Sequence, residues 1–301
     1  MSASIAVIGS VAFDTIETPA GRADDELGGS AMYFAVAASF FAPVHLVAPV
    51  GEDFPPASRA ALAARGIDLA SLETRPGTTF RWHGRYHEDV NKRDTLHLDL
   101  GVFAGFLPAL RDTVRAAPYV FLGNIDPALQ RAVLEQFTGP LLVGLDTMNH
   151  WIDAARPALE AILPRLDLLV INDEEARQLS GAGNVPTAAR RILERGVRRV
   201  LVKRGEYGAV LFSPGSVFAV PAFPLESVFD PTGAGDTFAG GLMGALAASG
   251  DRSDAGLRRA IVYGSVLASF VVEDFGPRRM LGLGRDDIEA RYRQFVALTQ
   301  F

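Results

Sequence analysis

The sequence predicts an α/β protein, with a mainly parallel sheet between two layers of helices and a small β-stranded lid. After residue 119, short apolar runs of the buried-strand type alternate with helical stretches, an order that produces parallel sheets. In residues 78–100, apolar and polar side chains alternate on both sides of a turn at residues 89–92, which predicts an antiparallel hairpin with one apolar face. A hairpin inserted among strand–helix units suggests a lid over a cleft. An edge hairpin of the main sheet is the alternative.

The chain before the hairpin is expected to start with strands and then alternate with helices. Residues 5–9 and 44–50 are apolar runs of the buried-strand type, and residues 13–18 alternate like a half-exposed strand. Helices are expected over residues 28–41 and 58–65. These elements place buried strands and a helix ahead of the hairpin.

The chain after the hairpin repeats strand–helix units, with one local strand pair before the last helices. The expected strands are residues 120–123, 141–146, 168–171, 200–203, 209–212 and 217–220. The expected helices are residues 127–137, 152–162, 173–179 and 187–195, and three more that start at Ala234, Gly256 and Asp286. No low-complexity linker or internal repeat interrupts this order.

Composition limits the kind of protein this can be. The 301 residues suit one large α/β domain or two smaller ones, and 49% of them are hydrophobic, enough for a sizeable core. A net charge of −6 without a basic run argues against a nucleic-acid partner, and without cysteine there is no disulfide or thiol chemistry. Residues 28–51 lack Asp, Glu, Lys and Arg, but two prolines and a histidine interrupt them, so a buried helix and strand are expected rather than a membrane span. Residues 1–4 carry no basic n-region, so we expect no signal peptide and a cytoplasmic protein.

The most informative stretch is residues 230–238, Asp-Pro-Thr-Gly-Ala-Gly-Asp-Thr-Phe. Its glycines allow the backbone to approach a ligand, and the first turn of the following helix leaves N–H groups that attract an anion. Asp236 lies in that turn, where its charge would repel a phosphate. A general base that removes a proton from an attacking hydroxyl would explain it, and so would an acidic residue that stabilises a helix start.

This nine-residue string resembles the C-terminal signature of the PfkB family, the ribokinase-like carbohydrate and nucleoside kinases. It is not a P-loop, because no Lys-Ser/Thr follows the glycines, nor a dinucleotide fingerprint, because Phe238 occupies the third glycine position. The resemblance implies a ribokinase-like three-layer α/β/α sandwich with a β lid. It assigns residues 1–11, 24–75 and 105–301 to the main domain, and 12–23 and 76–104 to the lid.

The resemblance also implies a reaction, the transfer of the γ-phosphoryl group of ATP to a hydroxyl of a small sugar or sugar-like metabolite. A nucleoside kinase of the same family is the alternative. Asp236 would be the base, and the N–H groups around Gly233, Ala234 and Gly235 would stabilise the transferring phosphoryl group. Two hypotheses come from other functional classes: a non-catalytic binding or regulatory protein, and a Rossmann-like oxidoreductase.

Further positions match the nucleotide side of the family pattern. Asn172 and Glu175 resemble the Asn-x-x-Glu motif that organises Mg²⁺ through water. The alternative is a purely structural role, as an N-cap followed by acidic residues in the first turn of a helix. The other nucleotide-binding residues that the resemblance implies are Lys203, Gly205, Gly208, Thr232 and Ser265. The residues implied for a monovalent cation such as K⁺ are Asp230, Thr232, Val271 and Gly276.

On the acceptor side, the resemblance assigns sugar hydroxyls to Asp14 and to the run Gly28-Gly29-Ser30. The chain departs from the family pattern where an Asn usually follows the glycines, since Ala31-Met32-Tyr33 stands there. The hairpin carries Trp82 and Tyr86, which would either stack on a base or sugar face or form the hairpin's own core. We expect a small-molecule acceptor, no nucleic acid, no membrane, and a homodimer through the lid.

Overall fold

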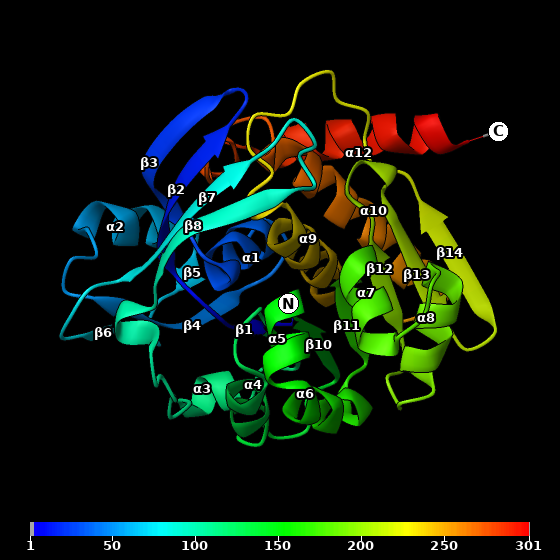
Figure 1. The fold of residues 1–301 in the computed structure, drawn as a ribbon, viewed down its shortest axis with the longest axis horizontal. Coiled ribbons are helices and arrows are strands. Elements are labelled where there is room, and N and C mark those ends of the chain that lie inside the picture. Colours follow the sequence, from blue (N-terminus) through cyan, green and yellow to red (C-terminus); the bar gives the residue numbers. More distant parts are fainter. Residues whose placement is uncertain (1–2, 301) are drawn as a thin grey trace. The chain divides into compact units, whose positions relative to one another are not determined.

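The computed structural model describes residues 3–300 and divides into two compact units. The first unit runs to Phe106 and resumes at Phe223, and the second comprises Leu107–Ala222. Strands and helices of both units are labelled in Figure 1. Each unit is built around buried strands whose side chains are aliphatic or aromatic.

The first unit contains a parallel sheet formed by the beginning of the chain. Its strands are β1 (Ile5–Ile8), β4 (Val44–Gly51), β5 (Ile67–Asp68) and β6 (Leu72–Arg75). Strand β4 pairs in parallel with β1, β5 and β6. All four residues of β1 are buried, as expected for a parallel strand that is covered on both faces.

A separate four-stranded sheet forms the lid, and we call it the lid sheet. Its strands, in spatial order, are β3 (Gly21–Gly28), β2 (Ala12–Thr18), β7 (Phe80–Tyr86) and β8 (Arg93–Asp99). The β7–β8 hairpin is antiparallel, as the alternating sequence predicts, whereas β2 and β7 are parallel neighbours. A one-turn 3-10 helix at Gly101–Phe103 follows the hairpin.

Six helices complete the first unit. They are α1 (Ser30–Ala38), α2 (Pro56–Ala64), α9 (Ala234–Ser249), α10 (Asp254–Val271), α11 (Arg278–Leu281) and α12 (Arg285–Thr299). Helices α1 and α10 both pack on α9, and glycines make this contact close. A Cβ at Gly240 would lie 2.3 Å from the Phe34 carbonyl oxygen, and one at Gly244 would lie 2.9 Å from the Phe41 ring. The small residues of α9 are therefore explained by helix packing.

The second unit is the repeating strand–helix part of the chain. Its strands, in spatial order, are β14 (Ser216–Val220), β13 (Ala209–Ser213), β12 (Val200–Lys203), β11 (Leu168–Asn172), β10 (Leu142–Asp146) and β9 (Tyr119–Leu122). Its helices are α3 (Asp112–Arg115), α4 (Pro127–Leu134), α5 (Asn149–Ala154), α6 (Arg156–Ile162), α7 (Asp173–Ser180) and α8 (Val185–Leu193). Strands β9 to β12 are parallel, and β13 and β14 form the predicted local pair.

Two of the differences from the sequence-based expectation have a clear cause. The single helix expected over residues 152–162 is interrupted at Ala155, because Pro157 stands at the start of α6 and lacks the N–H of a continuous helix. Strand β3 was not expected, since its charged and mostly exposed sequence carries no strand pattern of its own. Its pairing with β2 supplies the order that its sequence does not indicate.

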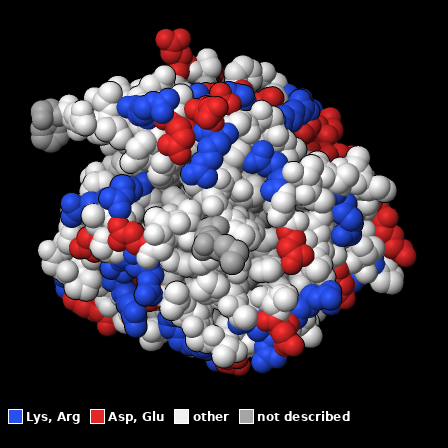
Figure 2. Space-filling model, turned by 180° about the vertical axis from the view of Figure 1, so that it is seen from behind, with Lys and Arg blue, Asp and Glu red and all other residues white. Residues whose placement is uncertain are grey.

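The surface of the protein carries charges of both signs. Acidic and basic side chains are interspersed over the face shown in Figure 2, without a broad field of one sign. Among residues 3–300, no helix has the length and apolar character that crossing a membrane requires.

Candidate active site

The start of α9 has the backbone conformation that its glycines predict. Gly233 precedes the helix with a φ of +73°, a left-handed conformation that favours glycine. Its carbonyl accepts the N–H of Thr237 at 2.8 Å, while the Ala234 N–H is already bonded to the Pro231 carbonyl at 3.2 Å. The first turn of a helix presents backbone N–H groups at its end, so this turn is a candidate anion site. Asp236 lies in this same turn.

Asp14 lies on the lid strand β2 and is only 4% exposed. Its carboxylate sits against the glycine pair, since a Cβ at Gly28 would fall 2.0 Å from its Oδ2, and the Gly29 N–H donates to it. Burial, followed by the nearby charges of Asp230 and Asp236, raises the pKa of Asp14 from 3.8 to about 8. The structure therefore brings the predicted acceptor carboxylate and the predicted base into one electrostatic neighbourhood.

Ser30 has a structural role in the hydrogen bonds at the start of α1. Its backbone N–H donates to the Ser10 hydroxyl at 3.0 Å, and its own hydroxyl lies 3.3 Å from that of Ser10. These bonds fix the start of α1 against the end of β1. Gly29 is equally constrained, because a Cβ there would lie 2.5 Å from the Ser10 carbonyl oxygen.

Asp230 ties together the segments before α9 and after α10. It is 1% exposed, and its carboxylate accepts the backbone N–H groups of Thr232 at 2.8 Å and Gly276 at 2.9 Å. Burial nevertheless raises the pKa of Asp230, because these bonds only partly replace water. Val271 is the last residue of α10, and the next carbonyl, that of Val272, accepts the Phe229 N–H at 2.8 Å. The four residues predicted for a cation thus lie at one junction.

One face of the lid sheet carries Asp14 in a row of cross-strand neighbours. The register places Asp14 beside Trp82 on β7, and Trp82 beside Leu98 on β8. Trp82 lies over Gly84, where a Cβ would be 2.0 Å from the indole ring, and Leu98 is 52% exposed. A carboxylate, an indole and an open apolar side chain therefore share this face, which we call the inner lid face.

The inner lid face is fastened to the loop that precedes α9. The hydroxyls of Tyr86 and Thr232 are hydrogen-bonded at 3.2 Å, and Thr18 of β2 donates to the Phe229 carbonyl at 2.8 Å. Tyr86 is buried, with its ring edge-on to Trp82 at a centroid distance of 6.5 Å. Strands β2 and β7 are thus both joined to the segment that leads into the first turn of α9.

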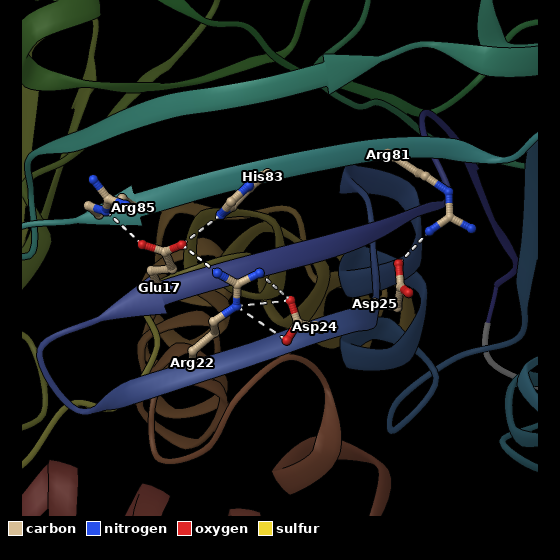
Figure 3. Close-up of polar contacts among 7 residues, drawn as sticks. All are labelled: Glu17, Arg22, Asp24, Asp25, Arg81, His83 and Arg85. Atoms are coloured by element: carbon tan, nitrogen blue, oxygen red, sulfur yellow. Dashed lines mark hydrogen bonds and ion pairs between the residues drawn. The ribbon is translucent and has the colours of Figure 1, made fainter.

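The opposite face of the lid sheet is occupied by ion pairs. In Figure 3, Glu17 of β2 accepts hydrogen bonds from Arg22, His83 and Arg85, and Arg22 also binds Asp24. Arg85 and His83 are the main reasons why the pKa of Glu17 is lowered. Arg81 binds Asp25 on the same face. These charges are already paired with one another, which leaves the inner lid face as the side that offers a ligand-binding surface.

In the second unit, the predicted nucleotide-side residues gather where parallel strands end. Asn172 of β11 is the register partner of Lys203 of β12. Asn172 and Glu175 form a capping box, with the Asn172 N–H bonded to Glu175 Oε2 at 2.9 Å and the Glu175 N–H bonded to Asn172 Oδ1 at 2.8 Å. The capping box is compatible with a role in metal binding, because a cap also holds the Glu175 carboxylate at a fixed place.

Asp146 is a residue that sequence reasoning missed. Its carboxylate, at the end of β10, accepts Lys203 Nζ at 2.7 Å and is 5% exposed. Lys203 is therefore not a solvated strand-end charge, because its ammonium group is paired with Asp146. The loop after β12 forms a 3-10 turn at Gly205–Tyr207, and Gly208, with φ of +84°, bonds its carbonyl to the Arg204 N–H at 2.8 Å. The order β10–β11–β12, which brings these residues together, cannot be read from any one strand.

The remaining predicted residue, Ser265, lies in α10 of the first unit and is 6% exposed. Among residues 3–300, no group of three or more His, Cys, Asp or Glu side chains could hold a metal ion.

Comparison with known proteins identifies the family. The family model described as pfkB family carbohydrate kinase matches residues 2–281. The chain belongs to the PfkB family. A PfkB-family protein of this kind is a phosphotransferase with an alcohol acceptor, and it phosphorylates a sugar or a nucleoside. The sequence-based recognition of the family and of the reaction class is thus confirmed.

Individual relatives include nucleoside and sugar kinases. A cytidine kinase of Thermococcus kodakarensis is 32% identical over 245 residues, which are 79% of this chain and 87% of that protein. A putative ribokinase II from E. coli, solved with ATP and Mg²⁺, has a TM-score of 0.78 at 22% identity and covers 98% of this chain and 99% of its own. A fructokinase double mutant from Vibrio cholerae, solved with fructose, ADP and potassium, has a TM-score of 0.78 at 18% identity, with 96% and 98% covered.

These structures confirm the predicted fold class. The PfkB chain described here has the ribokinase-like α/β fold, with a main mixed sheet flanked by helices and a small four-stranded lid sheet. Homologues of the family bind ATP with Mg²⁺, and one binds K⁺.

Proposed function

We propose that this PfkB kinase transfers the γ-phosphoryl group of ATP to a hydroxyl of a nucleoside. The inner lid face supports this most directly. Asp14 offers a carboxylate to ribose hydroxyls, and its neighbours Trp82 and Leu98 offer a planar and an apolar surface to a base. The similarity to a cytidine kinase points the same way.

A small sugar or sugar-like metabolite, the acceptor favoured from the sequence, is the second candidate. The observation that favours it is that Trp82 is already engaged within the lid. Its Nε1–H donates to the Thr95 hydroxyl at 3.2 Å, and its ring covers Gly84. If Trp82 serves only the hairpin, Asp14 and the glycine pair bind hydroxyls alone, which is what a free sugar requires.

In the proposed mechanism, the acceptor hydroxyl oxygen forms a bond to the γ-phosphorus while the bond to the β-phosphate oxygen breaks. Asp236 accepts the hydroxyl proton, and ADP carries away the electron pair of the broken bond. The backbone around Gly233, Ala234 and Gly235 presents N–H groups to the charge on the transferring phosphoryl group. Because the Ala234 N–H is bonded to Pro231, we assign most of this task to the N–H groups that follow it.

For ATP itself, we propose the nucleotide ligands that the family resemblance implies. They are Asn172, Glu175, Lys203, Gly205, Gly208, Thr232 and Ser265. The carboxylate of Glu175 and the amide of Asn172 are oxygen donors of the kind that hydrated Mg²⁺ accepts, so the residues fit the ion. Mg²⁺, when bound, would neutralise phosphate charge. The Asp146 partner would hold Lys203 extended toward the strand end.

We also propose a monovalent-cation site at the junction of Asp230, Thr232, Val271 and Gly276. The Asp230 carboxylate is almost fully buried, and burial raises its pKa although backbone N–H groups of Thr232 and Gly276 and the Thr232 side chain donate to it. A cation such as K⁺ among neighbouring carbonyls would offset that desolvation. The residues therefore fit the ion, which would supply only a fixed positive charge.

Replacing Trp82 with Ala tests the acceptor class. If a base stacks on the inner lid face, Trp82→Ala should lower kcat/KM for nucleosides by roughly 5- to 150-fold, the equivalent of about 1–3 kcal/mol for stacking on an aromatic ring, and barely affect free sugars. Turnover of a panel of nucleosides and sugars by wild type and variant is the measurement. Equal losses in both classes would make Trp82 hairpin core, and a panel in which only sugars react would overturn the nucleoside proposal.

Replacing Glu175 with Gln tests the magnesium role. Gln keeps the capping box, because its amide oxygen can still accept the Asn172 N–H, but it loses the charge. We expect the Mg²⁺ concentration for half-maximal rate to rise, with little change in the acceptor KM. Glu174→Gln, one position earlier in the same first turn, is the matched control. If both variants show the wild-type Mg²⁺ dependence, Glu175 is only a cap.

The homodimer expected from the sequence would use the open edge of the lid sheet. Strand β8 is the last strand of that sheet, and Leu96 and Leu98 on it and Leu100 just after it are each more than 40% exposed. A second copy that pairs with this edge would cover it. The solution mass from light scattering tests the proposal, and a monomeric mass would remove it.

A further inference from the structure

Tyr33 is a buried residue to which the mechanism above gives no role. It lies in α1, three residues after the start of the helix, and is 2% exposed. Its ring lies against Gly233, where a Cβ would be 2.4 Å from the ring atoms Cγ and Cδ2. The ring therefore supports the turn that starts α9, and position 233 can hold only glycine while Tyr33 occupies this place.

The hydroxyl of Tyr33 is the unusual part of the residue. It is buried and has no hydrogen-bond partner in the part of the chain that the structure describes. Burying a hydroxyl without a partner destabilises the folded state, so such a group calls for an explanation. Phenylalanine would fill the same space without that penalty.

The surroundings of this hydroxyl are acidic. Burial is the main reason why the pKa of Tyr33 is raised well above 10, and the neighbouring acidic groups Asp14, Asp230, Tyr86 and Asp236 add to it in that order. The phenol therefore keeps its proton and can act only as a donor toward a carboxylate. Two other charged groups face the same region from the lid, Glu26 beside Asp14 on β3 and Arg93 beside Tyr86 on β8.

We propose that the Tyr33 hydroxyl is a positioning hydrogen-bond donor for the Asp14 carboxylate in the acceptor-bound enzyme. The inference rests on the proposed role of Asp14 as the ligand of acceptor hydroxyls. In the acceptor complex, one Asp14 oxygen would accept a hydrogen bond from the phenol and the other would remain for the acceptor. Because the ring of Tyr33 also supports Gly233, the residue aligns the acceptor with the anion-binding turn.

This role predicts a specific electrostatic effect. A donor to the ionised carboxylate favours that form, and Asp14 needs such help because its surroundings favour the protonated acid. This effect on the ionisation of Asp14 is expected only in the acceptor complex, because the hydrogen bond from Tyr33 to Asp14 is not present in the acceptor-free structure. It should therefore appear in the pH profile of kcat, which reports the complex, rather than in the pKa values that kcat/KM reports for the free enzyme.

The experiment compares Tyr33→Phe with wild type. We expect kcat/KM for the acceptor to fall about 10-fold, the scale for one hydrogen bond to a charged group, and the acidic limb of the kcat profile to move to higher pH. The KM for ATP should not change, and the melting temperature should stay the same or rise. Ser71→Ala is the matched control, because it also deletes a buried hydroxyl without a partner. Ser71→Ala should alter neither kcat/KM for the acceptor nor the pH profile of kcat.

A double-mutant cycle with Asp14→Asn separates the two claims. If Tyr33 acts through Asp14, Tyr33→Phe should have no further effect on acceptor kinetics in the Asp14→Asn background. An unchanged kcat profile in Tyr33→Phe, or an equal loss in both backgrounds, would overturn the role of Tyr33. If Asp14→Asn alone leaves the acceptor KM unchanged, the proposed function has lost its acceptor ligand, and the role of Tyr33 fails with it.

Discussion

Replacing Asp236 with Asn should leave ATP binding intact and lower kcat by roughly 100-fold or more, the usual scale for the loss of a general base. Asn has the same shape and can still form hydrogen bonds in the first turn of α9, but it cannot accept the hydroxyl proton. The structure supports the choice of residue, because Asp236 lies in the first turn of α9 and is close enough to Asp14 to raise the pKa of Asp14. Steady-state kinetics and direct titration with a non-hydrolysable ATP analogue are the measurements.

The alternative for Asp236 is a helix-start acid, and the chain offers a matched control for it. Asp254 is an acidic residue in the first turn of α10, behind the N-cap Ser253. An acid at this position stabilises a helix by about 0.3–1 kcal/mol through the helix dipole. Asp254→Asn should therefore show a small stability change with normal kcat. If Asp236→Asn behaves in the same way, Asp236 is not the base.

Much of the architecture was predictable because short-range patterns are strong here. The buried apolar strands and the alternating hairpin appear as expected, since each obeys a periodicity visible within its own residues. The turn at residues 230–236 was predictable for the same reason, because a left-handed residue at Gly233 and a carboxylate in the first turn are properties of a continuous string.

What the sequence did not reveal depends on long-range pairing. Strand β3 exists because β2 supplies its partner, and the Asp146–Lys203 ion pair exists because β10 and β12 end at the same side of one sheet. Tyr33 stood out in the sequence only as a departure from the family pattern. Its packing under Gly233, 200 residues away, is a property of the folded chain. Residues that act through such contacts leave no local signal.

Replacing Asp14 with Asn should raise the acceptor KM by roughly 10- to 150-fold, the equivalent of about 1.5–3 kcal/mol for a hydrogen bond to a charged group. The KM for ATP should change much less. Because the pKa of Asp14 is about 8 in the acceptor-free protein, the carboxylate is largely protonated at pH 7. The wild-type acceptor KM should therefore fall as the pH rises toward 8, and the variant should lose this pH dependence.

The same substitution should stabilise the protein. The folded-state pKa of Asp14 is raised from 3.8 to about 8, so the stability contributed by this group is complete below pH 3.8 and is lost as the pH rises to about 8. The Asp14→Asn variant has no carboxyl group to ionise at this position, so it does not lose stability in this way. Its melting temperature should match that of wild type near pH 4 and exceed it increasingly toward pH 8, as expected where function requires a destabilising buried group.

Glu26→Gln is the control for this pair of effects. Glu26 is the register partner of Asp14 on β3, but it is ion-paired with Arg278. Its replacement removes a neighbouring negative charge without touching the carboxylate that faces the acceptor, so the acceptor KM should stay near the wild-type value. Equal acceptor KM values in Asp14→Asn and wild type would contradict the acceptor role. A melting-temperature difference that does not grow with pH would instead show that Asp14 is ionised in the folded protein, because only a raised pKa links its charge to stability in this range.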